Sequence, residues 1–248
     1  MRCDIVVLGG GKSLGKFGDA ECKAYVRIGG KMMAERVLAT MKKCVDYGKL
    51  VYVSASDSVP ETIRSIADRT VTGGARLIES AARGLEATDA EYAAFVPSDI
   101  PLVTEESFRD FMDKCRNGDA SFFYSFVRKE TSEKKYPGLR HTYVKLKDGT
   151  FCGGSFFLVK RADFPKGESF FRLLSEKRKN PLELAALFGP LNIAKMLMGI
   201  LSIRDLEKRA SKIIGAKVSS FESEHPEMAF NVDEPEDVER AEAELSRL

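Results

Sequence analysis

The chain has 248 residues, of which 44% are hydrophobic and 31% are charged, and its formal net charge is +2. This length can bury the full core of one α/β domain, and the composition is that of an ordinary globular protein. The nearly balanced charge excludes the basic footprint that is typical of nucleic-acid-binding proteins.

The cysteines indicate a reducing compartment. There are five of them, an odd number, and no C-x-x-C pair occurs, which argues against a disulfide framework or a zinc site. Residues 1–4 lead into an apolar run that is too short for a secretory signal. We therefore expect a cytoplasmic protein. Cys22, which precedes Lys23, is either a reactive thiol or, as we favour, a buried residue that only packs in the core.

Short apolar runs alternate with helical patterns in the first half of the chain. The runs have the length of buried strands, and the segments between them carry apolar residues at helical spacing. This alternation predicts a mostly parallel sheet with helices on both faces. The expected strands are 3–8, 50–54, 70–72 and 92–96, and a hairpin-like piece is expected at 25–31. The expected helices are 32–47, ended by Gly48; 58–67, with Pro60 in its first turn; 77–87; and one capped by Thr104.

The second half departs from this alternation. Two strand-like segments, 142–146 and 151–159, flank Asp148-Gly149, a dipeptide that favours a tight turn, so they predict a β-hairpin inserted into the sheet. A hairpin on a parallel sheet gives a mixed sheet. The other expected elements are strands at 120–127 and 217–221, a helical insert at 166–214, and a last helix with Pro235 in its first turn.

The segment 184–203 is nearly apolar over about twenty residues, the length of a membrane span. Gly189-Pro190, Asn192 and Lys195 interrupt it, so we expect two helices and no span. These helices pack on each other, form a homodimer surface, or line a site for an acceptor substrate. Together these patterns predict an α/β chain organised as one domain over 1–248, a three-layer sandwich with a mostly parallel mixed sheet.

A glycine-rich loop follows the first strand. Residues 9–18 contain five glycines with two lysines and a serine, and glycine lets the backbone come close to a ligand. Backbone N–H groups and lysines together form an anion cradle, which we favour over a plain tight turn. Phe17 stands where a Walker A motif needs Ser or Thr, and Leu14 stands where a dinucleotide-binding motif needs glycine. The loop therefore belongs to neither class.

Acidic residues follow two other strand ends. In an open α/β sheet, ligands bind beyond the carboxyl ends of the strands. Ser98 and Asp99 come directly after the run 92–96, and Asn231 and Asp233 precede the last helix. Each aspartate alone is also a good turn or helix-capping residue. Beside a phosphate-binding loop, however, the two carboxylates indicate a site for Mg²⁺, which prefers hard oxygen ligands.

These motifs, taken in order, resemble the MobA-like nucleotidyltransferases. That superfamily includes the molybdenum-cofactor guanylyl- and cytidylyltransferases and the sugar-phosphate and isoprenoid cytidylyltransferases, and its fold is GT-A-like, with a Rossmann-like sheet. Two departures occur in the first loop: Gly9 replaces the family's alanine, and Lys16-Phe17-Gly18 stands in for R-M-G after one extra residue. The matching stretches are Leu8-Gly9-Gly10-Gly11, Lys16 and Lys23, Val96–Leu102 and Phe230–Asp237.

The resemblance implies an enzyme that moves a nucleoside monophosphate from an NTP, with CTP or GTP favoured, to a small acceptor and releases pyrophosphate. Mg²⁺ is the implied cofactor. A glycosyltransferase on the same fold and a non-catalytic nucleotide-binding module are the alternatives. The implied residues are Lys16, Lys23 and Asp99 for catalysis; Asp99 and Asp233 for the metal, with Asn231 as a further candidate; and Leu8, Gly9, Gly10, Gly11, Lys23, Gly73, Gly74, Ser80 and Ser98 for the nucleotide.

Overall fold

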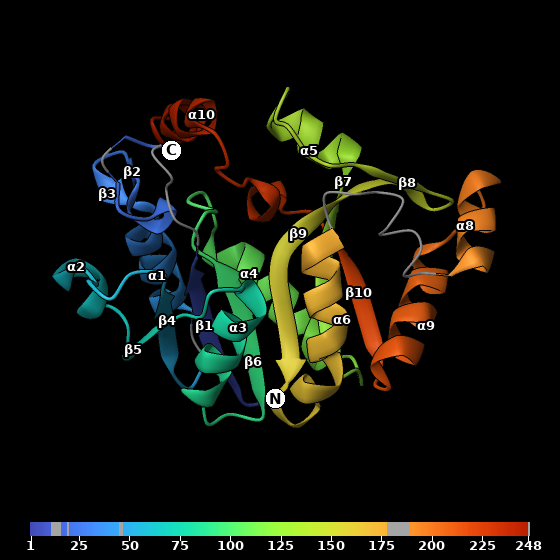
Figure 1. Cartoon of the computed structure of the whole chain (residues 1–248). Helices are drawn as coiled ribbons and strands as arrows, with labels where there is room; N and C mark the ends of the chain where they lie inside the picture. Colours follow the sequence, from blue (N-terminus) through green and yellow to red (C-terminus); the bar gives the residue numbers. More distant parts are fainter. Residues whose placement is uncertain (11–15, 19, 45–46, 178–188, 248) are drawn as a thin grey trace.

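The strand β1 (Cys3–Gly9) is an inner strand of the sheet (Figure 1). In the computed structural model, which describes residues 1–10, 16–18, 20–44, 47–177 and 189–247, β1 pairs in parallel with β4 (Leu50–Ser54) on one side and β6 (Tyr92–Pro97) on the other. All three strands are largely buried. Their continuous apolar runs are explained by helices covering both of their faces.

The remaining strands make the sheet mixed. Within the described residues its order is β10-β7-β9-β6-β1-β4-β5. β5 (Arg69–Thr72) is parallel to β4, and β10 (Val218–Ser223) is parallel to β7 (Phe122–Arg128). β9 (Gly149–Lys160) is antiparallel to both β6 and β7. The predicted mostly parallel mixed sheet is confirmed.

Both predicted hairpins form. β8 (Val144–Leu146) pairs antiparallel with the start of β9. The smaller hairpin joins β2 (Arg27–Ile28) to β3 (Lys31–Met32). Its turn residues, Gly29 and Gly30, have φ values of +55° and +80°, the left-handed conformation that a two-residue hairpin turn demands and glycine tolerates.

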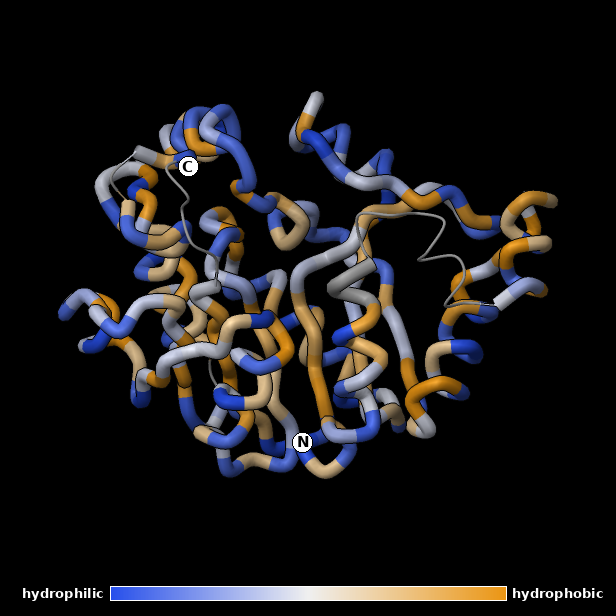
Figure 2. The backbone as a smooth tube through the Cα atoms, viewed as in Figure 1, coloured by the Kyte–Doolittle hydropathy of each residue, from blue (hydrophilic) through white to orange (hydrophobic). Residues whose placement is uncertain are grey.

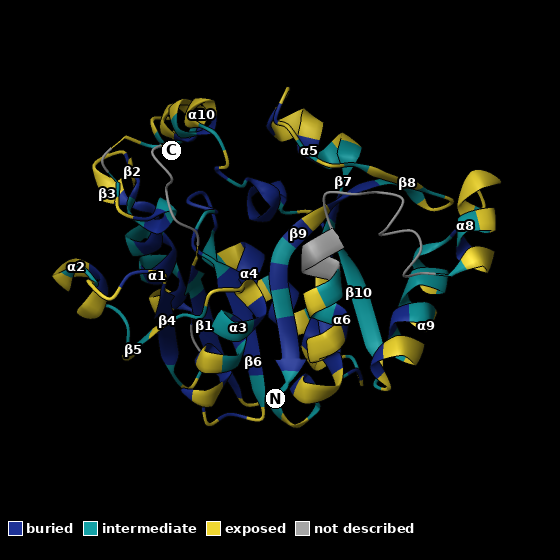
Figure 3. Cartoon of the chain, in the orientation of Figure 1, coloured by how far each residue is buried: buried dark blue, intermediate teal, exposed yellow. Residues whose placement is uncertain are grey.

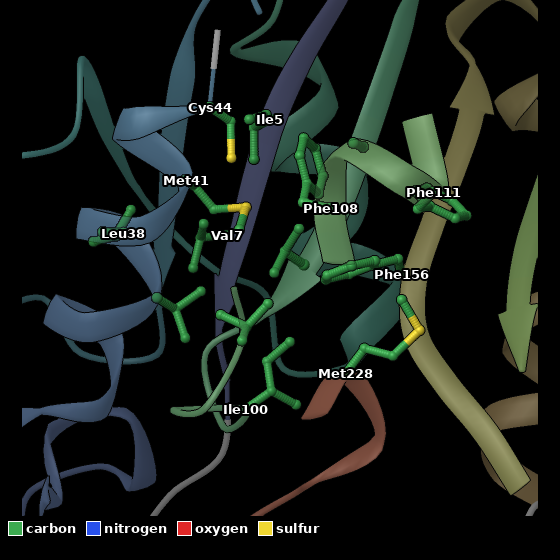
Figure 4. Close-up of a cluster of buried hydrophobic side chains, with 14 of the residues drawn as sticks. Ile5, Val7, Leu38, Met41, Cys44, Ile100, Phe108, Phe111, Phe156 and Met228 are labelled. Atoms are coloured by element: carbon green, nitrogen blue, oxygen red, sulfur yellow. The ribbon is translucent and has the colours of Figure 1, made fainter. Parts of the chain in front are cut away.

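One face of the sheet is covered by α1 (Met33–Lys43) and α4 (Glu105–Arg116). Figure 4 shows the core between them and the sheet, where Met41 of α1 and Phe108 of α4 lie beside Ile5 of β1. α4 begins as predicted, because the hydroxyl of Thr104 accepts a hydrogen bond from the Ser107 N–H at 3.1 Å.

The other face is covered by α3 (Leu77–Glu86), α6 (Phe164–Lys177) and α9 (Ile203–Ile214). In Figure 1, α3 and α6 lie in front of the sheet, and α9 lies beside β10. Helices on both faces of one sheet make the predicted three-layer α/β sandwich. α10 (Pro235–Leu245) and α5 (Lys129–Lys135) stand at the edge where the parallel strands end (Figure 1).

Two helices differ from their predicted bounds. α1 ends at Lys43, four residues before the predicted end. Gly48 is therefore not its C-cap glycine: its N–H donates to the Cys3 carbonyl at 2.7 Å, and a Cβ there would lie 2.2 Å from Asp4 Oδ1. α2 (Glu61–Arg64) is a single turn, and Pro60 precedes it as the N-cap residue.

The outer lobe, which we define as residues 144–147 and 189–214, projects at the far end of the sheet. It contains β8, α8 (Pro190–Leu197) and α9. The predicted helical insert is thus confirmed where the structure describes it, whereas 178–188 lies outside the described residues. α8 is apolar in Figure 2 and exposed in Figure 3. In the described part of the chain, no helix has both the length and the apolar character needed to cross a membrane.

Candidate active site

The predicted site residues meet at the carboxyl edge of the sheet. β1 and β6 are adjacent and parallel, with Leu8 opposite Pro97. The Ser98 N–H donates to the Leu8 carbonyl at 3.0 Å, and the Val232 N–H donates to the Asp99 carbonyl at 2.9 Å. These backbone bonds bring the end of β1, Ser98-Asp99 and the segment before α10 to one point, although they are far apart in the sequence.

Lys23 is the centre of this group. Its ammonium donates to Asp99 Oδ2 at 2.6 Å and to Asp233 Oδ1 at 2.7 Å. The side chains of Lys23 and Asp99 are 15% and 22% exposed, whereas that of Asp233 is 72% exposed. Burial alone would lower the pKa of Lys23, but the charge of Asp99 and the hydrogen bonds to both carboxylates outweigh it and raise the pKa above its ordinary value.

The structure thus brings Asp99 and Asp233 to the same ammonium, as their expected proximity requires; their role as metal ligands stays a prediction. Among the described contacts, neither aspartate side chain caps a helix, although Asp99 lies in a turn as the alternative interpretation expected. The Asp99 carboxylate accepts hydrogen bonds from the side chains of Lys23 and Asn231. The N-cap residue of α10 is Glu234. The Asp237 carboxylate accepts from the N–H groups of Asp233 and Glu234, at 3.0 and 2.9 Å, so the cap function belongs to Asp237.

Asn231 touches the other oxygen of Asp99. Its amide nitrogen donates to Asp99 Oδ1 at 3.3 Å, and its amide oxygen accepts from the Ser155 hydroxyl of β9 at 3.4 Å. The amide orientation is assigned from this pattern of donors and acceptors. Asp99 is thereby held from both sides, with one oxygen on Asn231 and the other on Lys23. Ser155 is a site residue that no sequence motif indicated.

Lys16 lies at the exposed side of the group. Its ammonium pairs with the Glu234 carboxylate and approaches the Asp233 carbonyl at 3.4 Å. The side chain is 51% exposed, which leaves it free to move toward a bound anion. Lys16 therefore contacts Asp233 and Glu234, in the segment before α10, and makes no described contact with Asp99.

The glycine loop is tight where β1 ends. A Cβ on Gly9 would lie 2.1 Å from the Tyr52 hydroxyl, so only glycine fits there. That hydroxyl is buried and has no hydrogen-bond partner among the described residues. Gly10 has open space around its Cα, and Gly18 has a φ of +61°. Gly11 lies outside the described residues, and its nucleotide-binding role stays a prediction.

Gly73, Gly74 and Ser80, which are predicted to bind the nucleotide, follow β5, two strands away from β1. Ser54, at the end of β4, is opposite Gly9, and its carbonyl accepts from the Gly73 N–H at 2.7 Å. The Ser80 hydroxyl accepts from the Gly74 N–H at 3.1 Å. Gly73, Gly74 and Ser80 are therefore joined to one another and to the same edge of the sheet as the glycine loop.

The donor set suits a magnesium ion. No group of three or more His, Cys, Asp or Glu side chains gathers as a metal centre in the part of the chain that the structure describes. However, Mg²⁺ commonly takes only one or two carboxylates and completes its shell with phosphate oxygens and water. Asp99 and Asp233 both face one cationic group, the Lys23 ammonium, so their oxygens converge on a position that a cation occupies.

Cys22 follows the favoured prediction. It is 2% exposed, and burial raises the pKa of its thiol above the ordinary value. Since the thiolate is the nucleophilic form of cysteine, this position suits packing better than reaction.

A comparison with family models decides the family. The model of the MobA-like NTP transferase domain matches residues 5–182, which include the glycine loop, Lys23, the 73–80 segment and Asp99. The chain belongs to this family. Asn231 and Asp233 lie beyond the matched region, so their place in the site rests on the geometry above. A search of curated protein sequences returned no match.

Solved structures agree with this assignment. A hypothetical transferase from Thermus thermophilus is 33% identical, with a TM-score of 0.81 over 96% of this chain and 100% of that one. A 2-C-methyl-D-erythritol 4-phosphate cytidylyltransferase, also from Thermus thermophilus, is 15% identical, with a TM-score of 0.60 over 100% of both chains. A CMP:2-keto-3-deoxy-manno-octonic acid synthetase complexed with CTP is 11% identical, with a TM-score of 0.64 over 100% of this chain and 99% of that one. At such low identities the last two share the fold of this MobA-like domain.

Proposed function

We propose that this MobA-like NTP transferase joins a nucleoside monophosphate from CTP to a phosphate or hydroxyl oxygen of a small acceptor, with GTP as the second candidate donor. The acceptor oxygen forms a bond to the α-phosphorus, the bond from that phosphorus to the bridging oxygen breaks, and pyrophosphate leaves. The observation that carries the proposal is the Lys23 ammonium between Asp99 and Asp233, at the edge of the sheet where β1 and β6 end.

Positioning and electrostatics account for most of the rate in such a reaction, because the protein needs to supply no nucleophile. We assign the binding of the triphosphate to the backbone of Leu8–Gly11 and to Ser98. Lys23, and Lys16 from its exposed position, neutralise the charge that develops on the phosphoryl oxygens and on the leaving pyrophosphate. Asn231 keeps the Asp99 carboxylate turned toward Lys23.

We propose Asp99 and Asp233 as the residues that hold Mg²⁺. When bound, the ion supplies charge neutralisation on the phosphate oxygens. In the structure Lys23 occupies the position between the carboxylates. The flexible stem of a lysine lets its ammonium turn to the phosphates while keeping its charge.

CTP is favoured over GTP for two reasons. The Gly73-Gly74…Ser80 segment resembles the base-recognition segment of cytidylyltransferases, and it lies at the same sheet edge as the glycine loop. In addition, the relatives of the same fold named above include a cytidylyltransferase and a synthetase complexed with CTP.

The test measures pyrophosphate release from each of the four NTPs with Mg²⁺, against a panel of phosphate- and hydroxyl-bearing acceptors. Thermal-shift measurements with the same NTPs identify the donor independently of the acceptor. We expect the largest stabilisation and turnover with CTP. Transfer of a sugar without pyrophosphate release, or NTP binding without turnover on any acceptor, would contradict the proposal.

The matched variant is Asp99→Asn, which keeps the shape of the side chain and removes its charge. Loss of one preorganised electrostatic group costs roughly 10²–10³-fold in turnover, and we expect a loss in this range. Asp119→Asn is the control, because Asp119 pairs with Lys217 on the surface and is 82% exposed. If Asp99→Asn stays within about twofold of wild type, the site is wrong.

A further inference from the structure

A cavity lies beside the loop 101–104, which follows Asp99. Its volume is about 220 Å³. It opens between one side of α1, the loop 101–104 and the end of α10. The residues that line it include Lys31, Arg36, Thr40, Lys43, Leu102 and Val103.

Arg36 is a preorganised cation in this cavity. Its Nε donates to the Ile28 carbonyl at 2.7 Å and its Nη2 to the Gly29 carbonyl at 2.9 Å. These bonds fix the plane of the guanidinium but leave its charge without a carboxylate within the described residues. The nearby Glu242 carboxylate instead accepts from the Gly29 N–H at 3.1 Å. A guanidinium that is already held in place loses little entropy when it binds an anion.

Lys31 and Lys43 add two further positive charges. Lys31 makes no ion pair with any residue that the structure describes, and Lys43 lies 3.9 Å from Glu105 with its side chain 70% exposed. Thr40 adds a hydroxyl on the side of α1 that carries Arg36 and Lys43. No acidic residue lines the described cavity, so its wall is cationic.

The floor of the cavity is apolar. Leu102 and Val103 are 6% and 5% exposed, and Leu245 closes the end. A cavity of roughly 150 Å³ lined by apolar side chains holds a benzene molecule, so this larger one has room for a ring or a short alkyl group. A cationic wall above an apolar floor matches a molecule with an anionic head and a compact apolar body.

We propose that this cavity binds a small organic anion, with a phosphate or carboxylate head on Arg36, Lys31 and Lys43 and an apolar body on Leu102 and Val103. The site is distinct from the nucleotide-binding edge. It touches segments that continue from that edge, because the loop 101–104 follows Asp99 and α10 follows Asp233.

The experiment titrates ¹³C-methyl-labelled protein with phenyl phosphate, benzoate and phenol and follows the methyl signals of Leu102, Val103 and Leu245 by NMR. Titrations are repeated with saturating CTP and Mg²⁺, which fill the proposed nucleotide site. We expect both anions to shift these signals with and without nucleotide, and phenol to bind at least fivefold more weakly. The two anions show which head group the site prefers.

The variant is Lys31→Gln with Lys43→Gln, and its control is Lys212→Gln on the exposed end of α9. Each partly exposed charge contributes modestly, so we expect the double variant to bind phenyl phosphate about fivefold more weakly, with unchanged melting temperature, and the control to bind as wild type. Equal affinity of the double variant and wild type would overturn the proposal. So would loss of all methyl shifts in the presence of nucleotide, or equal binding of phenol. None of these readouts depends on turnover, so a failure here is distinguishable from a failure of the proposed function.

Discussion

The active-site edge and the outer lobe are built in opposite ways. At the edge, Lys23 bonds Asp233, 210 positions away, and Lys16 pairs with Glu234, 218 positions away. In the outer lobe, Lys195 pairs with Asp205, ten positions away. The edge is therefore assembled by the topology of the sheet. In the lobe, the Lys147 N–H donates to the Leu201 carbonyl at 2.8 Å, and α9 is held on β10, where the Ser220 N–H donates to Glu207 Oε1, 13 positions away, at 2.6 Å.

The two regions also differ in what they leave exposed. At the edge, polar side chains pair with one another around Lys23. In the lobe, Leu191, Leu197 and Met198 are 70%, 81% and 62% exposed. The comparison teaches that the edge has little freedom to vary, because each substitution there leaves a charge or a polar group unpaired. The lobe tolerates change, because its outward side chains contact little.

The largest effect should come from Lys23→Met. The change removes the cation that both carboxylates share and leaves Asp99 and Asp233 facing each other. We expect turnover to fall roughly 10²–10³-fold, the cost of one preorganised charge, as measured by pyrophosphate release. Lys49→Met is the control, because Lys49 forms a comparable pair with Asp89 on the surface.

The pH dependence of this effect has a definite sign. Because the pKa of Lys23 is raised, its contribution to stability is fully present below the unfolded value of about 10.4 and is lost only as the pH rises through the folded value. The difference in melting temperature between wild type and Lys23→Met should thus be constant from pH 7 to pH 9. A difference that shrinks over this range would show that Lys23 is not held as an ammonium.

Gly9→Ala tests the tight end of β1. Its Cβ would collide with the Tyr52 hydroxyl, and overpacking of this kind costs about 1–3 kcal/mol of unfolding free energy. Denaturation by urea measures the loss. Adding Tyr52→Leu removes the colliding ring, so the double variant should lose less stability than the sum of the two single variants. If the stability losses of the two single variants simply add, the contact with Tyr52 is not the cause of the loss in Gly9→Ala.

Asn231→Ala tests the support of Asp99. Removal of a group that orients a functional carboxylate typically costs 10–100-fold in affinity or activity, and the 3.3 Å length of this hydrogen bond places the expectation near tenfold. Pyrophosphate release and the apparent Mg²⁺ affinity measure the effect. Ser155→Ala should show a smaller change in the same direction. If the apparent Mg²⁺ affinity of Asn231→Ala equals that of wild type, Asn231 does not support the proposed metal site.

The smallest effect should come from Leu197→Ser in the outer lobe. Since this side chain is 81% exposed, the unfolding free energy should change by no more than about 0.5 kcal/mol, and NTP affinity should be unchanged. Urea denaturation and the thermal shift with CTP measure both. A loss comparable to that of Gly9→Ala would show that α8 packs against another surface, which would weaken the contrast between the two regions.

The strands of the sheet were predictable because their signals are local. Apolar runs such as 92–96 have the length of a buried strand, and the residues after them had to lie at one edge. Helix ends were less predictable: α1 ends at Lys43, and Gly48, the expected C-cap glycine, is instead bonded to β1. That bond joins two distant segments, and helical periodicity carries no information about it.

The sequence predicted which residues gather at the site, but not which side chains each of them contacts. Asp99 and Asp233 could be placed together from strand ends and the family resemblance. The sequence did not show that Lys23 lies between them, that Asp237 rather than Asp233 caps α10, or that Ser155 supports Asn231. Each of these contacts joins side chains whose geometry depends on the packed sheet. Only the pattern Asp233-Glu234-Pro235-Glu236-Asp237 contained a signal for the cap, in the acid three positions after Glu234.

The direction of β9 has an evolutionary consequence. Because this strand is antiparallel to β6 and β7, it begins at the edge where its parallel neighbours end. Insertions or deletions in the turn between β8 and β9 would thus change the length of this hairpin without shifting the register of β1, β4 or β6. Homologous chains can therefore differ in length at this turn while the parallel strands that position Asp99 keep their pairing.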